Sequence, residues 1–454
     1  MKRTVLSLVF LTGLGIIAPA YAQSSTNQQP TRVSLSDYST SSTASAEASA
    51  SEEPRESQAA PESEPRPEYA PREVEAEIPE TEEAADDEAW HLLPQDGAIR
   101  VYGWVDAGVT ANSGNPVSRY NGPVSFNDRN ELQMNQLYAV IEKPLSEEEG
   151  RWNFAGRVDV LFGSDYIFTQ AAGLELRDDY SPKWNSGPLY GLAMPQLYGE
   201  MAYDKLNIRL GHFYTIIGYE VVTAPDNFFT SHAYTMQYGE QFTHTGGRAS
   251  YAMTDELSLT GGLVNGWDKW DAVTNRAAFL GGVNFTPDHE LYTVAFSLIT
   301  GEEDGALPPI LGNRTVYSLV VSLNLTEKLQ YVIEHDNGWQ ANGLGTDETT
   351  RWYGLNQYLL YTLNDNWKAG IRGEWFKDAD GTRVTGVRAT NPYKGGSAGD
   401  FYEISLGLNW TRFSNVTVRP EVRWDWFNGE GTMPYDDNTK NSQFLANCDF
   451  IVSW

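Results

Sequence analysis

The feature that most limits how this chain can fold is an alternation of polar and apolar residues with a period of two. It recurs in segments of about ten residues that continue to the end of the sequence. In one segment, Val418, Pro420, Val422, Trp424 and Trp426 alternate with Arg419, Glu421, Arg423 and Asp425. Because successive side chains of a β-strand point to opposite faces, this pattern predicts strands with one apolar and one charged face.

Sixteen segments of this kind are predicted to be strands. They are Ile99–Thr110, Glu131–Glu142, Trp152–Phe162, Met194–Tyr203, Leu206–Phe213, Phe242–Met253, Leu257–Asn265, Ala277–Thr286, Glu290–Ile299, Arg314–Leu325, Leu329–Asp336, Arg351–Leu363, Trp367–Phe376, Phe401–Trp410, Val416–Phe427 and Gln443–Trp454.

The connections between these segments are alternately short and long. Asp204–Lys205 and Thr254–Glu256 are short, whereas Ala111–Asn130, Gly163–Ala193 and Tyr214–Gln241 are long. An even number of strands with short turns at one end and long loops at the other is typical of a transmembrane antiparallel β-barrel. Closure of such a barrel pairs every backbone group within the lipid, so the fold needs no continuous apolar run.

The amino-terminal region predicts export. Lys2 and Arg3 precede the apolar run Val5–Pro19, and Ala20-Tyr21-Ala22 supplies small residues for cleavage, so residues 1–22 are expected to be a signal peptide. Residues 23–89 are rich in Pro, Glu, Ser and Ala and are expected to form a disordered acidic periplasmic segment before a barrel domain at 90–454. This segment is either a spacer or a tether to another part of the cell envelope.

The predicted facing places charged residues of both signs in the barrel interior. The candidate pore-lining residues are Arg157, Asp159, Arg248, Lys368, Arg372, Glu374, Glu403, Arg419, Glu421, Arg423 and Asp425. Such an interior is costly to dehydrate, and barrels of about 16 to 18 strands enclose an aqueous channel. The sequence therefore predicts a water-filled pore.

The chain contains a single cysteine, Cys448, which leaves no disulfide, no Cys-X-X-Cys pair and no cysteine-based metal site. No cofactor, no metal and no nucleic-acid partner are expected. The alternation puts Cys448 on the lipid-facing side of the last strand with Phe450, Val452 and Trp454. This aromatic ending resembles the signal that the barrel assembly machinery reads.

The segment Gly211–Asp268 carries the elements GHFYTIIGYEV, NFFTSHAYT, FTHTG and VNGWD. These elements resemble the signature region of the OmpL-like putative β-barrel porins, also called the porin-2 family, and the similarity covers Ala98–Trp454. The resemblance implies an outer-membrane pore for small hydrophilic solutes. It implies no particular binding residues.

The connection Tyr214–Gln241 is the candidate for narrowing the pore, because the third long loop folds inward in many sixteen-stranded porins. It carries Glu220, Asp226 and Glu240. Arginines expected to face it are Arg157, Arg209, Arg248, Arg372, Arg419 and Arg423. An acidic face opposite a basic face would create a transverse field, and the acidic balance of the barrel favours mild cation preference. The alternative is that these arginines form internal ion pairs or are strand-end charges without any effect on selectivity.

Other functions stay open from the sequence. Ser231, His232 and Asp226 could belong to a hydrolase, and Asp378-Ala-Asp380-Gly381 is a weak match to a calcium loop. A structural, adhesive or envelope-tethering role is a further alternative. The expected partners are outer-membrane lipid, lipopolysaccharide, the barrel assembly machinery, small hydrophilic solutes and two further copies in a homotrimer.

Overall fold

The computed structural model describes residues 98–146, 150–177, 180–272, 276–287, 291–304, 311–345 and 347–454. The predicted signal peptide (1–22), the predicted acidic segment (23–89) and the first residues of the predicted barrel domain (90–97) lie outside the described residues.

Sixteen strands form one closed barrel, as the sequence predicts. They are β1 (Arg100–Asn112), β2 (Leu132–Lys143), β3 (Asn153–Gly163), β4 (Gly191–Tyr203), β5 (Leu206–Tyr214), β6 (Thr243–Ala252), β7 (Leu257–Val264), β8 (Ala278–Phe285), β9 (Tyr292–Asp304), β10 (Leu311–Thr326), β11 (Leu329–Gln340), β12 (Thr350–Asn364), β13 (Trp367–Asp378), β14 (Ala398–Phe413), β15 (Val416–Glu430) and β16 (Ser442–Ser453). Within the described ranges, the connections contain the short helical segments η2 (Asp165–Phe168), η3 (Ala224–Asp226) and η4 (Thr235–Gly239).

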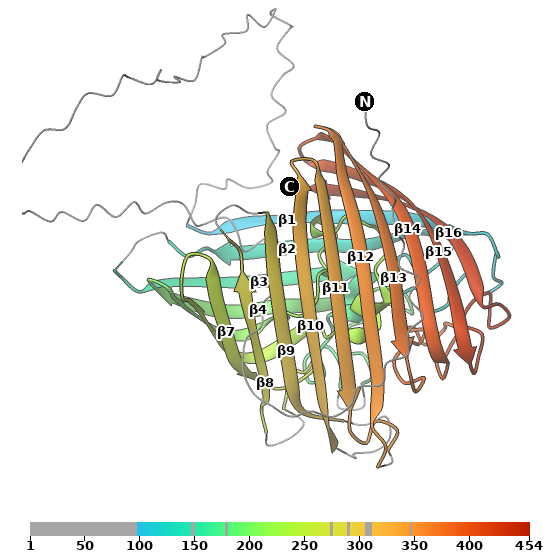
Figure 1. Ribbon diagram of the computed structural model, residues 1–454, viewed down its shortest axis with the longest axis horizontal. Helices are drawn as coiled ribbons and strands as arrows, with labels where there is room; N and C mark the ends of the chain where they lie inside the picture. The colour runs from blue at the N-terminus through green and yellow to red at the C-terminus, as the bar shows by residue number, and fades with distance from the viewer. Residues whose placement is uncertain are drawn as a thin grey trace, which may run out of the picture.

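Each strand pairs antiparallel with its neighbours in the chain, and β1 pairs with β16 to complete the ring (Figure 1). The closing register runs from Trp104 opposite Ser453 to Asn112 opposite Leu445. Closure leaves no free sheet edge, which satisfies the backbone groups that would otherwise face lipid.

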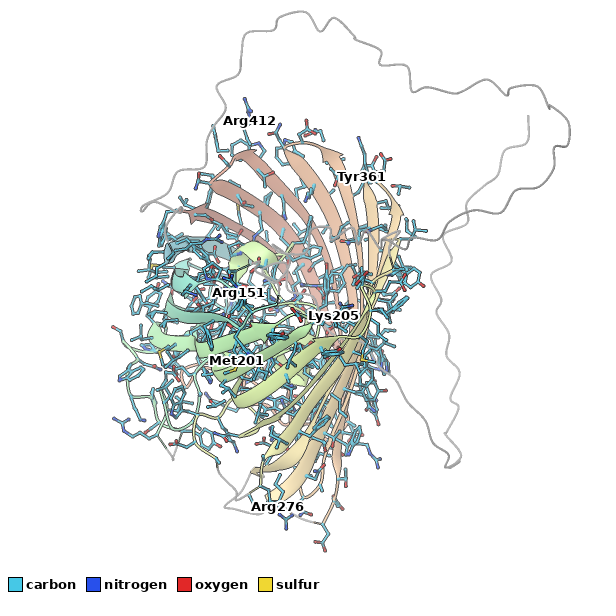
Figure 2. The ribbon with its side chains drawn as sticks, turned by 90° about the vertical axis from the view of Figure 1, so that its left-hand side faces the viewer. Arg151, Met201, Lys205, Arg276, Tyr361 and Arg412 are labelled. Carbon is cyan, nitrogen blue, oxygen red and sulfur yellow. The ribbon has the colours of Figure 1, made fainter. Side chains whose placement is uncertain are left out.

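Short turns and long loops lie at opposite ends of the barrel. Arg412, near the turn between β14 and β15, and Arg276, in the connection between β7 and β8, are far apart along the strands (Figure 2). None of the helices in the described ranges is long and apolar enough to cross a lipid bilayer.

The predicted facing of β15 agrees with the structure. Trp424 is 51% exposed on the outer surface, whereas its neighbours Arg423 and Asp425 are fully buried on the inner side. In β16, Phe450 and Val452 are exposed while Asp449 is buried. The outer wall is therefore apolar and the inner wall charged, as a barrel in lipid requires.

The main difference from the sequence-based strands lies in β9 and β10. Their pairing continues as far as Asp304 opposite Leu311, beyond the predicted ends Ile299 and Arg314. The extension contains Glu302 and Glu303, which interrupt the apolar pattern. Backbone pairing continues there because antiparallel hydrogen bonding does not depend on an apolar face.

Cys448 lies opposite Val109 and Pro420, on the same outer face as Phe450. In membranes, we expect a membrane-impermeant maleimide to leave the wild-type protein unlabelled, because this thiol faces lipid. The variant Cys448→Ser/Thr432→Cys, with its thiol at an exposed loop residue, should be labelled rapidly. The measurement is mass spectrometry of the intact protein, and prompt labelling of wild-type protein would contradict the facing.

Candidate functional site

The connection between β5 and β6, residues 215–242, crosses the barrel interior. The backbone N–H of Ala224 donates to Gln136 on β2, while that of Tyr219 donates to Glu334 on β11, and Tyr234 donates to Glu374 on β13. Because these strands belong to different sides of the wall, the connection spans the interior (Figure 1). We call residues 215–242 the inward segment.

Local sequence shapes the inward segment. The hydroxyl of Thr223 donates to Asp226 at 2.6 Å, and the side-chain amide of Asn227 donates to the carbonyls of Val221 and Thr223. Such short-range side-chain bonds stabilise turns. Gly218 has φ +85°, and a Cβ there would meet the carboxylate of Glu240 at 1.9 Å, so only glycine fits.

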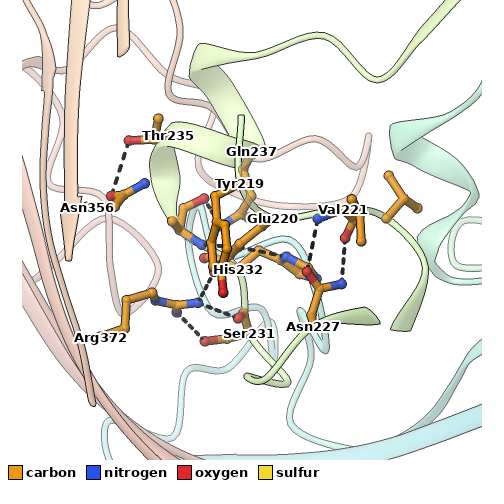
Figure 3. A network of polar contacts seen from close by, with 12 residues as sticks. Tyr219, Glu220, Val221, Asn227, Ser231, His232, Thr235, Gln237, Asn356 and Arg372 are labelled. Atoms are coloured by element: carbon orange, nitrogen blue, oxygen red, sulfur yellow. Dashed lines mark hydrogen bonds and ion pairs between the residues drawn. The ribbon is translucent and has the colours of Figure 1, made fainter. Parts of the chain in front are cut away.

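Arg372 on β13 is the main anchor of the inward segment (Figure 3). Its guanidinium binds the carboxylates of Glu220 at 2.7 Å and Glu403 at 2.6 Å, and it donates to the carbonyl oxygen of Ser231 at 2.7 Å. Arg372 and Glu403 are fully buried. The wall and the segment therefore share one dehydrated ionic network.

Two arginines of β15 extend this network. Arg423 binds Asp425 at 2.8 Å and donates to the carbonyl of His232 at 2.6 Å. Arg419 pairs with Asp449 and donates to the carbonyl oxygens of the segment at Ala224 and Asn227. Buried guanidinium groups with several acceptors hold neighbouring chain segments in a fixed geometry. The inward segment is thus fastened to β13–β15.

Glu220 is ionised in this site. Burial alone would raise the pKa of Glu220, but the Arg372 guanidinium and the hydrogen bonds from His232 and Ala233 hold that pKa well below its usual range. Burial lowers the pKa of His232, so its neutral ring donates from Nδ1 to Glu220 at 2.8 Å.

The sequence predicts an acidic face of this segment opposite a basic face of arginines. The structure shows a different arrangement. Glu220 contacts Arg372 directly, which matches the ion-pair alternative. Glu240 is also buried, near Gly218. Asp226 stays partly exposed and is the most accessible of the three predicted acidic residues.

The predicted pore-lining residues fall into two groups. Arg372, Glu374, Glu403, Arg419, Glu421, Arg423 and Asp425 are buried beneath the inward segment. Asp159 is buried in an ion pair with Arg157, which is partly exposed. Arg248 on β6 is partly exposed and Lys368, near a short turn, is exposed. The buried charges of β13–β15 thus hold the segment, while Arg157, Arg248 and Lys368 remain at least partly accessible.

Carboxylate oxygens of Glu240, Glu334 and Asp336 lie within 4.8 Å of one another. Hard divalent cations such as calcium favour such oxygen ligands, so these residues could hold one. Sequence reasoning missed the group because Glu240 lies far from the other two in the chain. The predicted calcium loop instead forms a turn, in which Asp378 accepts three backbone N–H groups and Asp380 accepts one from Arg351.

Ser231, His232 and Asp226 are not arranged as a hydrolytic triad. The Ser231 hydroxyl donates to Glu421, His232 bonds Glu220, and Asp226 accepts from Thr223. A triad requires the base to contact both the nucleophile and the orienting carboxylate. This geometry gives the three residues a role in packing the segment.

Sequence reasoning also missed a cluster near the long-loop end. Arg314, Arg383 and Trp352 gather around Trp267, with both guanidinium groups packed on the indole ring of Trp267. Their positions on four separate connections or strands gave no reason to group them.

Replacement of Arg372 by methionine should destabilise the barrel, because Glu220 and Glu403 would remain buried without their cation. Breaking a buried ion pair in this way costs about 3–5 kcal/mol. The measurement is reversible urea unfolding of protein in detergent micelles, and Arg412→Met, at an exposed residue of β14, is the matched control. Equal free energies of unfolding for wild type and Arg372→Met would contradict the anchoring role.

Comparison with solved structures finds the same fold at low sequence identity. The outer membrane channel DcaP of Acinetobacter baumannii has a TM-score of 0.51 and 10% identity, over 78% of this chain and 97% of that chain. OmpT, an outer membrane protein of Vibrio cholerae, has a TM-score of 0.52 and 10% identity, over 80% of this chain and 100% of that chain. No curated protein sequence matches.

A family model covers all of the ranges that the structure describes. It is described as putative beta-barrel porin-2, OmpL-like, and it matches residues 98–454. This range is the one over which the sequence resemblance was expected. The barrel fold and this match support location in an outer membrane. The chain belongs to the OmpL-like beta-barrel porin-2 family.

Proposed function

We propose that the protein is a non-enzymatic outer-membrane porin, whose water-filled channel lets small hydrophilic solutes and ions diffuse passively. The observation that carries the proposal is the asymmetric filling of the barrel. The inward segment bonds to β2 and to β11–β15, and its Ile216 and Ile217 belong to one buried cluster with apolar residues of β7–β10. Inner residues in the middle of β6 and β7 stay partly exposed.

The opposite wall supports a path for water. Arg248 and Ser250 of β6 and Thr260 of β7 are partly exposed on the inner side, and the hydroxyls of Ser250 and Thr260 bond each other at 2.8 Å. Hydroxyl and guanidinium groups on the inner face favour hydration of the space beside them. We assign the solute path to the space beside these partly exposed residues of β6 and β7, since the inner residues Leu280, Ile299 and Val316 of β8–β10 are buried.

The inward segment is the proposed constriction, and Asp226 is its most accessible acidic residue. A carboxylate at a narrow point attracts cations and repels anions. We therefore propose mild cation preference, with Asp226 contributing directly. Glu220 and Glu240, which are buried, would contribute by holding the segment in place.

Other parts of the proposal rest on sequence alone. Residues 23–89 would extend into the periplasm, and the last strand would be recognised by the barrel assembly machinery. Lipopolysaccharide would surround the outer rim. Association into a homotrimer is testable by native mass spectrometry of the detergent-solubilised protein.

In planar lipid bilayers, purified refolded protein should give stepwise increases of conductance at neutral pH, because each inserted barrel adds one aqueous path. Single-channel recording measures the step size. Protein that is fully folded by circular dichroism and inserts into the bilayer without any current would contradict the channel. That result would favour a structural or adhesive role.

Replacement of Asp226 by asparagine should lower the permeability ratio of potassium to chloride by roughly twofold, the effect of one screened charge at a constriction. Reversal potentials in a salt gradient measure this ratio. Asp255→Asn is the matched control, since Asp255 is an exposed carboxylate in a short turn at the other end of the barrel. An unchanged ratio in Asp226→Asn would remove this residue from the solute path.

A further inference from the structure

Two arginines meet at one tryptophan near the long-loop end of the barrel. The Cζ atom of Arg314 lies 4.6 Å from the ring centroid of Trp267, and that of Arg383 lies 4.8 Å from it. Arg383 also lies over the ring of Trp352, with its Cζ atom 4.7 Å from the centroid. The two indole rings meet edge to face at 6.2 Å.

These groups face the barrel interior next to the inward segment. Arg314 is on the same face of β10 as Val316 and Ser318, both of which are buried, and it lies opposite Gln340 of β11. Arg383 donates from Nε to the carbonyl of Tyr238, and Trp352 donates to the carbonyl of Gly239. The pair therefore lies beside the end of η4, where the segment turns back toward β6.

Neither arginine has an ion-pair partner among the residues that the structure describes. Arg314 donates from Nε to the side chain of Gln340 at 2.8 Å. Across the described ranges, no acceptor takes a hydrogen bond from the terminal nitrogens of either guanidinium, and both side chains are partly exposed. Each arginine thus keeps unused donors that solvent can reach.

The carboxylates nearest to Arg383 are engaged elsewhere. Asp378 accepts backbone N–H groups from the following turn, Asp268 accepts those of Phe242 and Thr243, and Glu303 pairs with Lys269 at 2.9 Å. They contribute to the local field without binding the guanidinium. The two cations thus lie against the same indole ring, and no carboxylate of the described ranges binds either guanidinium.

This arrangement has an electrostatic cost. Partial burial, together with the charge of Arg314, lowers the pKa of Arg383. Like charges that are held together by packing gain free energy when an anion binds both of them. The tryptophan rings fix the guanidinium planes and so limit the entropy lost on binding.

We propose that Arg314 and Arg383 form a binding subsite for the anionic oxygens of a small carboxylate- or phosphate-bearing solute at the loop end of the channel. The subsite deepens the proposed porin function and rests on it. Guanidinium groups bind such oxyanions through paired, charge-assisted hydrogen bonds. Because both Cζ atoms lie near the Trp267 ring centroid, their separation cannot exceed the sum of the two distances to that centroid. A dicarboxylate, or one phosphate together with water, can span this separation.

The subsite is compatible with a cation-preferring constriction. Chloride lacks the paired oxygens that a guanidinium recognises, so the subsite would do little for bulk chloride current. It would instead retain one class of organic or inorganic oxyanion at the mouth. Retention at the mouth raises the local concentration of that solute on the loop side of the inward segment.

The test is single-channel recording in potassium chloride with succinate or phosphate added to the loop side. We expect the anion to interrupt the wild-type current, and the concentration for half-maximal block to rise roughly tenfold or more in Arg314→Gln/Arg383→Gln. Arg383→Lys should give an intermediate value, because it keeps the charge and loses the paired geometry. Arg412→Gln, at an exposed residue near the opposite end, should match wild type.

Comparison of the two anions identifies the recognised group, since block by only one of them assigns the subsite to carboxylate or to phosphate. Arg314→Gln alone provides a milder variant, because the side chain of Gln340 is the sole described acceptor that Arg314 loses. Heat-dependent electrophoretic mobility verifies that each variant has folded as a barrel. Equal block of wild type and the double variant by both anions would overturn the subsite.

Calorimetric titration of succinate or phosphate into detergent-solubilised protein gives a readout that needs no current. Heat of binding in wild type that is lost in the double variant supports the subsite even if no channel opens, in which case the porin function alone fails. Normal conductance with no heat and no block by either anion overturns the subsite and leaves the porin function intact.

Discussion

Pairing of β1 with β16 is the constraint on which the rest of this structure depends. A sheet in lipid cannot leave its edges unpaired, so the first and last strands must meet. Closure at sixteen strands sets an interior too wide for wall side chains to fill. The space that remains is shared between the inward segment and the proposed solute path.

The charged interior serves a different purpose on different sides of the barrel. On β13–β15, arginine and glutamate side chains are buried in an ionic network that fastens the inward segment. A buried network of this kind adds little net stability over an apolar equivalent, but it fixes geometry, since each group has few alternative partners. On β6 and β7, Arg248, Ser250 and Thr260 stay partly exposed on the inner side, whereas His244 and Val264 are buried. The inward segment thus leaves part of the inner faces of β6 and β7 accessible.

The sequence predicted the facing of the strand residues well and the contacts inside the barrel poorly. The period of two in Val416–Phe427 correctly separated Trp424 from Arg423, because strand geometry depends only on neighbouring residues. The ends of β9 and β10 were predicted too short, since hydrogen-bonded pairing runs past the apolar pattern. Glu220 was placed on a narrowing loop by analogy, yet its contact with Arg372 joins residues far apart in the chain. The grouping of Trp267 with Arg314 and Arg383 had no sequence signal for the same reason.

The sequence by itself determined the strand number, the alternation of short and long connections, and the faces of the alternating side chains in strands such as β15 and β16. These properties follow from local patterns of polarity and turn residues. Only the tertiary structure decided which charges became buried anchors and which stayed open to water. The physical reason is that burial of a charge depends on the path of a segment across the barrel, and that path depends on contacts between distant strands.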